Sequence, residues 1–141
     1  MFYGEFPHSL DIKNRIVIPA KFRAALGDAF IITRGWDKCL TIYTMDEWRN
    51  LEEKVKALPR ADEDVRRFMR IFFGGACECE PDAHGRVLIP QTLREHAGIV
   101  RDIVSVGVLE RIEVWGKEYW DERGSCEIDD NIARVMKEFG I

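Results

Sequence analysis

Two stretches of the chain share one spacing of charged residues around a predicted turn. In each, an aspartate is followed four positions later by an arginine, and then by a short apolar run and a proline. The segment DIKNRIVIP begins at Asp11 and the segment DAHGRVLIP begins at Asp82. Asn14 and Gly85 hold the position before the arginine, and both residue types tolerate the left-handed backbone of a tight turn. The aspartate can accept hydrogen bonds from the turn amides and from the arginine, which would fix the direction of the guanidinium.

A guanidinium held in one direction suits bidentate contact with guanine in the DNA major groove, or with two phosphate oxygens. Arg15 and Arg86 are therefore the main candidate DNA contacts, and Asp11 and Asp82 are candidates for orienting them. A local ion pair that only stiffens the turn is the alternative, because exposed pairs contribute only about 0–1 kcal/mol. Repetition of the whole pattern favours DNA contact. The further candidates are Lys13, Asn14, His84 and Gly85 in the turns, and Lys21, Arg23 and Arg94 for flanking phosphates.

The duplicated pattern belongs to a longer internal repeat. Residues 10–27 align with residues 81–98 at an offset of 71, with six identical pairs. After one added residue, LTIYTMDEW from Leu40 parallels IEVWGKEYW from Ile112. We predict a first repeat over residues 1–74 and a second over residues 75–141, interlocked as one compact domain.

Each repeat is predicted to contain the same elements, which makes the fold class α+β. RIVIP and RVLIP read as strands, and each proline then opens a helix that stops at Gly27 or Gly98. FIITRGWDKCLTIY and DIVSVGVLERIEVW read as hairpins, and a second helix follows each. Thr44 and Glu47 form a capping box for the first of these helices. Apolar stripes at helical spacing indicate core or partner-facing surfaces: Met45, Trp48, Leu51, Val55 and Leu58; Val65, Phe68, Met69 and Phe72; Ile132, Val135, Met136 and Phe139.

Composition and charge describe a globular chain with an uneven charge distribution. The 141 residues are enough to bury a core without disulfide bonds or metal ions, and no apolar run is long enough to cross a bilayer. The N-terminus lacks signal-peptide features, so we expect a cytoplasmic, nucleoid-associated protein. The net charge is −4, but residues 1–36 carry +2. Four cysteines without CxxC spacing are expected to be free thiols, and Cys77, Cys79 and His84 leave a zinc ion one ligand short, so no metal or cofactor is expected.

At these residues the sequence resembles the MraZ family of bacterial regulators, over nearly the full length. Asn14 departs from the glycine that is usual in the family. The resemblance implies a duplicated AbrB-like swapped-hairpin β-barrel with flanking helices, and a homo-oligomeric ring. It also implies binding of double-stranded DNA at short direct repeats upstream of the division and cell-wall gene cluster, with Arg15 and Arg86 in the DNA-binding role. An antitoxin-like or sporulation-type AbrB relative is the alternative within DNA binding, although such proteins more often carry one unit and dimerise.

Two other classes of function compete with DNA binding. An enzyme is disfavoured, because the chain has no GxSxG or HExxH motif, and Cys77 and Cys79 lie among carboxylates that raise thiol pKa values. No small-molecule substrate or membrane partner is expected. A non-enzymatic structural or protein-interaction assembly module would use the apolar helices to assemble and the turns only for shape.

Overall fold

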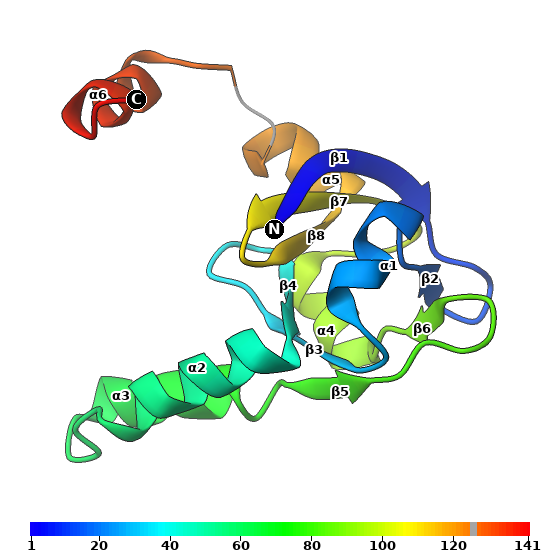
Figure 1. Cartoon of the computed structure of the whole chain (residues 1–141), viewed down its shortest axis with the longest axis horizontal. Coiled ribbons are helices and arrows are strands. Elements are labelled where there is room, and N and C mark those ends of the chain that lie inside the picture. The colour runs from blue at the N-terminus through cyan, green and yellow to red at the C-terminus, as the bar shows by residue number, and fades with distance from the viewer. Residues whose placement is uncertain (125–126) are drawn as a thin grey trace.

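The computed structural model describes residues 1–124 and 127–141, which form a mixed α+β fold with antiparallel strands (Figure 1). The strands are β1 (Phe2–Ser9), β2 (Arg15–Val17), β3 (Phe30–Arg34), β4 (Leu40–Thr44), β5 (Cys77–Cys79), β6 (Arg86–Leu88), β7 (Asp102–Leu109) and β8 (Ile112–Gly116). The helices are α1 (Ala20–Leu26), α2 (Met45–Lys56), α3 (Glu63–Phe72), α4 (Gln91–Ala97), α5 (Lys117–Tyr119) and α6 (Asp130–Glu138), with a π-helical turn η1 (Trp120–Gly124). None of the helices in these two ranges is both long and apolar enough to cross a membrane.

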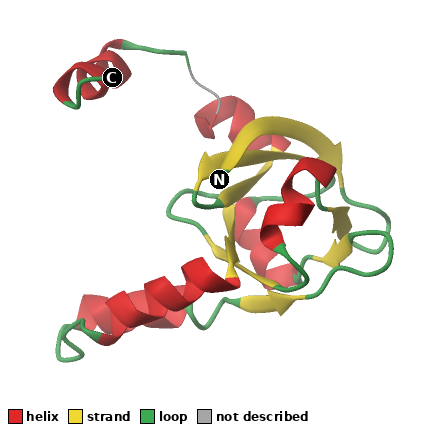
Figure 2. Ribbon diagram, viewed as in Figure 1, coloured by secondary structure: helices red, strands yellow, loops and turns green. Residues whose placement is uncertain are grey.

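The strand order is symmetric with respect to the two sequence repeats. Six strands form one sheet in the order β1-β7-β8-β4-β3-β5, and β2 pairs with β6 in a separate two-stranded ribbon. Exchanging the repeats maps β1 onto β5, β7 onto β3 and β8 onto β4, so the order reads the same in both directions. Each outer strand pairs with a hairpin of the other repeat. The sheet is open between β1 and β5 in the described part of the chain, and the ribbon lies at that open side (Figure 2).

The predicted start and stop signals of the short helices are confirmed, with one shift of position. Pro19 and Pro90 are the N-cap residues of α1 and α4 rather than their first helical residues. Gly27 and Gly98 end the two helices, both with positive φ, as a helix-terminating glycine allows. Both predicted hairpins form, as β3–β4 and as β7–β8.

The main core lies between the curved sheet, the ribbon, α1 and α4. Phe22 of α1 is 1% exposed and packs edge-on against Phe2 and Phe6 of β1, at ring-centroid distances of 5.6 and 5.0 Å. Ile16 and Val87, at the centre of the β2–β6 ribbon, belong to the same core. The ribbon is therefore anchored from beneath by apolar side chains that both repeats contribute.

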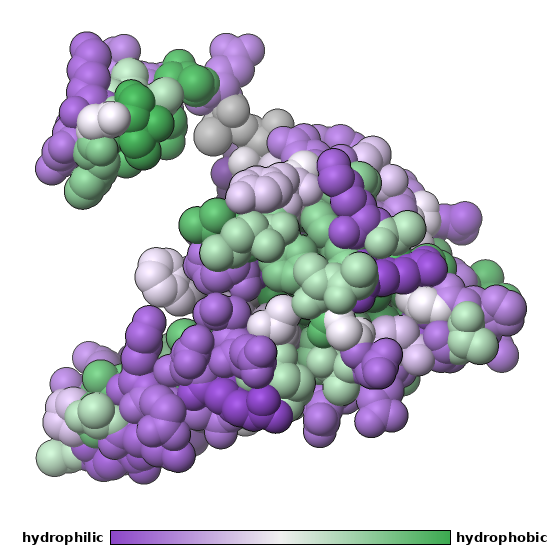
Figure 3. Space-filling view, viewed as in Figure 1, coloured by the Kyte–Doolittle hydropathy of each residue, from purple (hydrophilic) through white to green (hydrophobic). Residues whose placement is uncertain are grey.

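A second cluster joins an arm of two helices to the sheet. The α2–α3 pair projects from the body (Figure 1), and its outer surface is largely hydrophilic in Figure 3. Trp48 of α2 stacks on Phe72 of α3 at 5.3 Å, and both pack against Ile31 and Tyr43 of the sheet. The buried Thr33 hydroxyl donates to the Phe72 carbonyl at 2.5 Å, which ties the end of α3 to β3. The Thr44 hydroxyl accepts from the Glu47 amide, which confirms Thr44 as the N-cap of α2, whereas the reciprocal bond from the Thr44 amide to the Glu47 carboxylate is not found among the described residues.

Three features of the fold differ from the sequence-based expectations or were absent from them. The N-terminal strand β1 was not predicted, because FYGEFPHS contains a glycine and a proline and lacks a clean alternation. The helix after the second hairpin is only the short α5 followed by η1. The stripe on α6 is not core within the chain: Ile132, Val135 and Phe139 are exposed, and α6 stands apart from the body (Figure 1).

Truncation of the central aromatic side chain tests this packing. We expect Phe22→Ala to lower the free energy of unfolding by about 3–5 kcal/mol, because it removes two edge-on ring contacts and leaves a cavity. The exposed Arg49→Ala should change it by less than about 0.5 kcal/mol. Chemical denaturation followed by tryptophan fluorescence measures both. If Phe22→Ala lowers the free energy of unfolding no more than Arg49→Ala does, the assignment of Phe22 to the core is wrong.

Candidate nucleic-acid interface

The first aspartate organises the turn between β1 and β2 through one carboxylate. Its Oδ1 accepts from the amides of Lys13 and Arg15, both at 2.9 Å, and its Oδ2 accepts from the Arg15 Nε at 2.8 Å. The Asp11 amide donates to the Arg15 carbonyl, which closes the turn. Asn14 has φ 60°, so it adopts the left-handed conformation that its place in the turn requires. Asn14 therefore adopts a backbone conformation for which glycine is the ordinary choice.

The second turn repeats these contacts atom for atom. Asp82 Oδ1 accepts from the amides of His84 and Arg86 at 2.9 Å each, and its Oδ2 accepts from the Arg86 Nε at 2.7 Å. Gly85 has φ 75°, matching Asn14. In both turns the carboxylate engages Nε, and no hydrogen bond of the terminal guanidinium nitrogens to another described residue is found for Arg15 or Arg86.

These hydrogen bonds keep the two carboxylates ionised. The amide of Arg86 is the largest influence lowering the pKa of Asp82 to about 2, and its guanidinium and the His84 amide act in the same direction. The pKa of Asp11 is lowered for the same reasons, with the Arg15 amide first. Because the folded-state pKa of each aspartate is lower than its ordinary value, the ionised carboxylate stabilises the turn fully when the pH is above that ordinary value. That stabilisation is lost as the pH falls through the folded-state value.

The β2–β6 ribbon brings the two arginines to one surface. Arg15 pairs with Leu88 and Arg86 pairs with Val17, on either side of the buried Ile16–Val87 pair. Because side chains alternate along a strand, these flanking pairs lie on the face opposite the core. The side chains of Arg15 and Arg86 are 25% and 33% exposed, so neither is hidden beneath the fold. Diagonal neighbours in such a ribbon have Cα atoms about 7–8 Å apart, which one stretch of duplex could span.

Two candidate phosphate-binding residues instead brace the strand ends. The Arg23 Nε donates to the Ile18 carbonyl at 2.8 Å, and an Arg94 terminal nitrogen donates to the Ile89 carbonyl. The guanidinium of Arg23 lies against Gly85, where a Cβ would approach within 2.7 Å of its central carbon. Arg23 from the first repeat therefore supports the turn of the second. Lys21 is exposed on α1.

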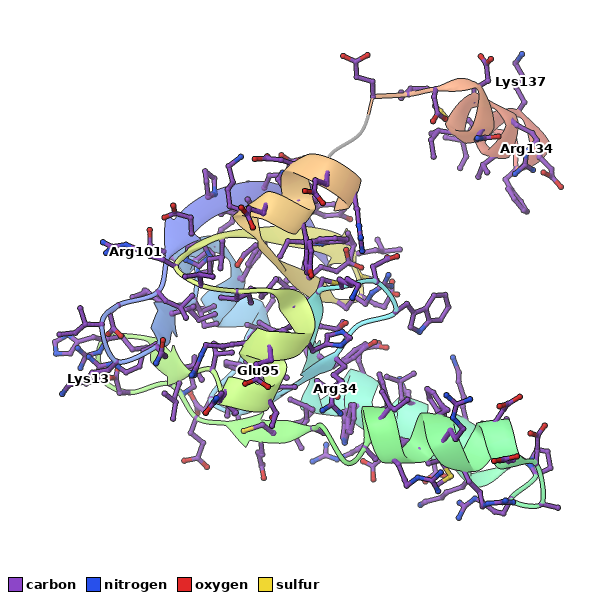
Figure 4. All side chains as sticks on the ribbon, turned by 180° about the vertical axis from the view of Figure 1, so that it is seen from behind. Lys13, Arg34, Glu95, Arg101, Arg134 and Lys137 are labelled. Atoms are coloured by element: carbon purple, nitrogen blue, oxygen red, sulfur yellow. The ribbon has the colours of Figure 1, made fainter. Side chains whose placement is uncertain are left out.

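The remaining predicted residues lie at the tip that both turns form. Lys13 is at the end of the molecule farthest from the α2–α3 arm in Figure 4, and His84 is exposed in the second turn. Arg101 is a neighbour that the sequence did not single out. Its carbonyl accepts from the Leu10 amide at 2.9 Å, because the β1–β7 register brings Ser9 opposite Asp102. The pairing of β1 with β7 therefore places the positive charge of Arg101 beside the first turn, which a local sequence pattern could not predict.

The surroundings of the two turns differ in charge. Arg101 lines a hollow with Leu10, Asp11 and Asn14 at the first turn. At the second turn a larger hollow of about 710 Å³ is lined by Asp28, Glu80 and Asp82, with Arg23. The first turn therefore has the more basic setting, although the contacts within the two turns are alike.

Three of the four cysteines lie in the described part of the chain. Cys39, Cys77 and Cys79 are free thiols, whereas Cys126 lies outside the described residues. Burial raises the pKa of Cys39 and of Cys79 to about 12, which disfavours the nucleophilic thiolate. Within residues 1–124 and 127–141 no cluster of three potential metal ligands is present.

Comparison with known proteins places this doubled turn in a family. The family model described as "MraZ protein, putative antitoxin-like" matches residues 1–71 and again residues 72–131. The chain belongs to the MraZ family. Proteins named "Transcriptional regulator MraZ" are 56% identical in Clostridium beijerinckii, 54% in Clostridium tetani and 52% in Caldanaerobacter subterraneus subsp. tengcongensis. Each alignment covers 100% of this chain and 100% of the relative.

Membership of the MraZ family confirms the family resemblance that the two DxxxR segments indicated. It also agrees with the expectation of a non-enzymatic chain, because the MraZ relatives are named as regulators of transcription.

Titration of the turn carboxylates tests the geometry of the site. We expect the Asp82 side-chain carbon to titrate in the folded protein with a midpoint near pH 2, because its ionised form accepts three hydrogen bonds. Carbon-detected NMR across an acid titration gives the midpoint, and the aspartate of a short unstructured peptide serves as the reference carboxylate. If Asp82 titrates together with the peptide aspartate, the carboxylate does not hold the turn.

Proposed function

We propose that this chain is a sequence-specific, double-stranded-DNA-binding transcriptional regulator that presents Arg15 and Arg86 to the major groove. The observation that carries the proposal is the paired site: two identical carboxylate-held arginines on one exposed face of a ribbon. An antiparallel two-stranded ribbon fits the major groove, and arginine bound to guanine O6 and N7 is the commonest specific contact there. The regulators named among the MraZ relatives support the same function.

The other turn residues take supporting roles in this proposal. Lys13, His84 and Arg101 would contact phosphates at the rim, since their side chains lie around the tip or beside it. Lys21 could reach a flanking phosphate from α1. Asn14 and Gly85 would let the backbone approach the DNA, while Asp11 and Asp82 orient the arginines. Arg23 and Arg94 would act mainly by bracing the strand ends, given their bonds to the Ile18 and Ile89 carbonyls.

We further propose that residues 1–74 and 75–141 are two AbrB-like repeats interlocked as a swapped-hairpin barrel. The exchange of outer strands supports this arrangement, because β1 pairs with β7 and β5 pairs with β3. The position of the β2–β6 ribbon at the open side of the curved sheet supports it too.

The net charge of −4 leaves a single subunit with little general attraction to DNA. We propose that a homo-oligomeric ring, acting in the cytoplasm at the nucleoid, compensates by engaging several short direct repeats upstream of the division and cell-wall genes. Linked binding of this kind can exceed single-site affinity by about 100-fold or more. The exposed apolar face of α6 offers a surface for such assembly.

Removing the two arginines tests the function directly. We expect Arg15→Ala/Arg86→Ala to bind a DNA fragment recovered by selection from random sequence at least tenfold more weakly than the parent protein. The reason is that each bidentate contact with guanine contributes about 1–3 kcal/mol. Fluorescence anisotropy at several salt concentrations should also show a shallower salt dependence.

The matched control is Arg49→Ala/Arg67→Ala, which removes the same charge from exposed helix positions of the α2–α3 arm. This control should bind nearly as the parent does. Equal binding by the parent and the Arg15→Ala/Arg86→Ala variant would refute the assigned site.

A further inference from the structure

Two exposed apolar side chains lie between the candidate DNA-contacting arginines. Val17 is 43% exposed and Leu88 is 56% exposed, and the register pairs Val17 with Arg86 and Arg15 with Leu88. The solvent face of the ribbon thus carries two arginines and two aliphatic residues in a two-fold pattern. Ile16 and Val87 fill the opposite, buried face.

The ribbon's exposed aliphatic residues are not explained by packing within the chain. Outward-facing strand positions are ordinarily polar when they meet only water. The core of the ribbon is already supplied by Ile16 and Val87, which are 0% and 5% exposed. Val17 and Leu88 are therefore available to a partner that covers the same face as Arg15 and Arg86.

We propose that Val17 and Leu88 are specificity-determining residues that contact thymine C5-methyl groups in the major groove. This inference rests on the proposed DNA-binding function. The two guanidinium groups on the face select a polyanion, and the thymine methyl is the apolar group that the major groove displays. Two residues along a strand span about 6.8 Å, close to two base-pair steps of about 3.4 Å. Each arginine would therefore read a guanine while its aliphatic neighbour reads a thymine within about two steps.

The test removes only the methyl groups from the DNA. The probe is the most enriched duplex from the random-sequence selection, synthesised once with thymine and once with deoxyuridine at every thymine. We expect the parent protein to bind the deoxyuridine duplex roughly fourfold more weakly for each contacted methyl. Val17→Ala/Leu88→Ala should bind the thymine duplex more weakly than the parent does and should show little difference between the two duplexes.

A matched control is Leu58→Ala/Ile71→Ala, which trims two exposed aliphatic side chains, one just after α2 and one on α3, away from the ribbon. It should retain the parent's preference for thymine. Val17→Thr, which keeps the shape of the side chain, checks that any loss does not come from misfolding and should lower the preference without changing the far-ultraviolet circular dichroism.

The possible outcomes separate the two proposals. A parent that binds both duplexes equally overturns methyl recognition while the DNA-binding function stands. A parent that binds no duplex overturns the function itself. If the Val17→Ala/Leu88→Ala variant keeps the thymine preference but forms a smaller assembly by light scattering, the two residues serve contact between copies of the chain, and the inference is wrong.

Discussion

The candidate interface depends on one carboxylate in each turn and the hydrogen bonds it accepts. One oxygen of Asp11 or Asp82 takes two turn amides, and the other takes the Nε of the arginine. Because the carboxylate engages Nε and no hydrogen bond from the terminal nitrogens to a described residue is found, the guanidinium is held while its terminal nitrogens remain able to donate. Without the carboxylate, both the turn and the direction of the long side chain would be undefined.

The β2–β6 ribbon places the two carboxylate–arginine pairs on one surface. Pairing of β2 with β6 brings turns that lie 71 residues apart in sequence together, and burial of Ile16 and Val87 fixes which face of the ribbon meets solvent. A shift of one residue in register would turn the arginine of the shifted strand toward the core, since side chains alternate along a strand. Arg23 adds to this coupling by resting on Gly85 of the other repeat. Core packing and the candidate site are thus consequences of the same strand pairing.

Local patterns in the sequence were enough to predict the turns, both hairpins and most helices. Proline before α1 and α4, the Thr44 cap and the duplicated DxxxR spacing act over a few residues, so they can be read directly. The strand β1, the position of Arg101 and the contact of Arg23 with Gly85 of the other repeat depend on long-range pairing, which no local pattern encodes. The stripe on α6 was predicted as core or partner surface, and periodicity alone could not show that its own chain leaves it uncovered.

The central claim is that the arginines are held in place before DNA binds, and NMR relaxation at arginine Nε measures this most directly. In the DNA-free protein, Arg15 and Arg86 should show order parameters approaching the rigid-backbone value of about 0.85, whereas the exposed Arg49 should fall below about 0.6. Order parameters for Arg15 and Arg86 as low as that of Arg49 would show that the carboxylates do not organise the site.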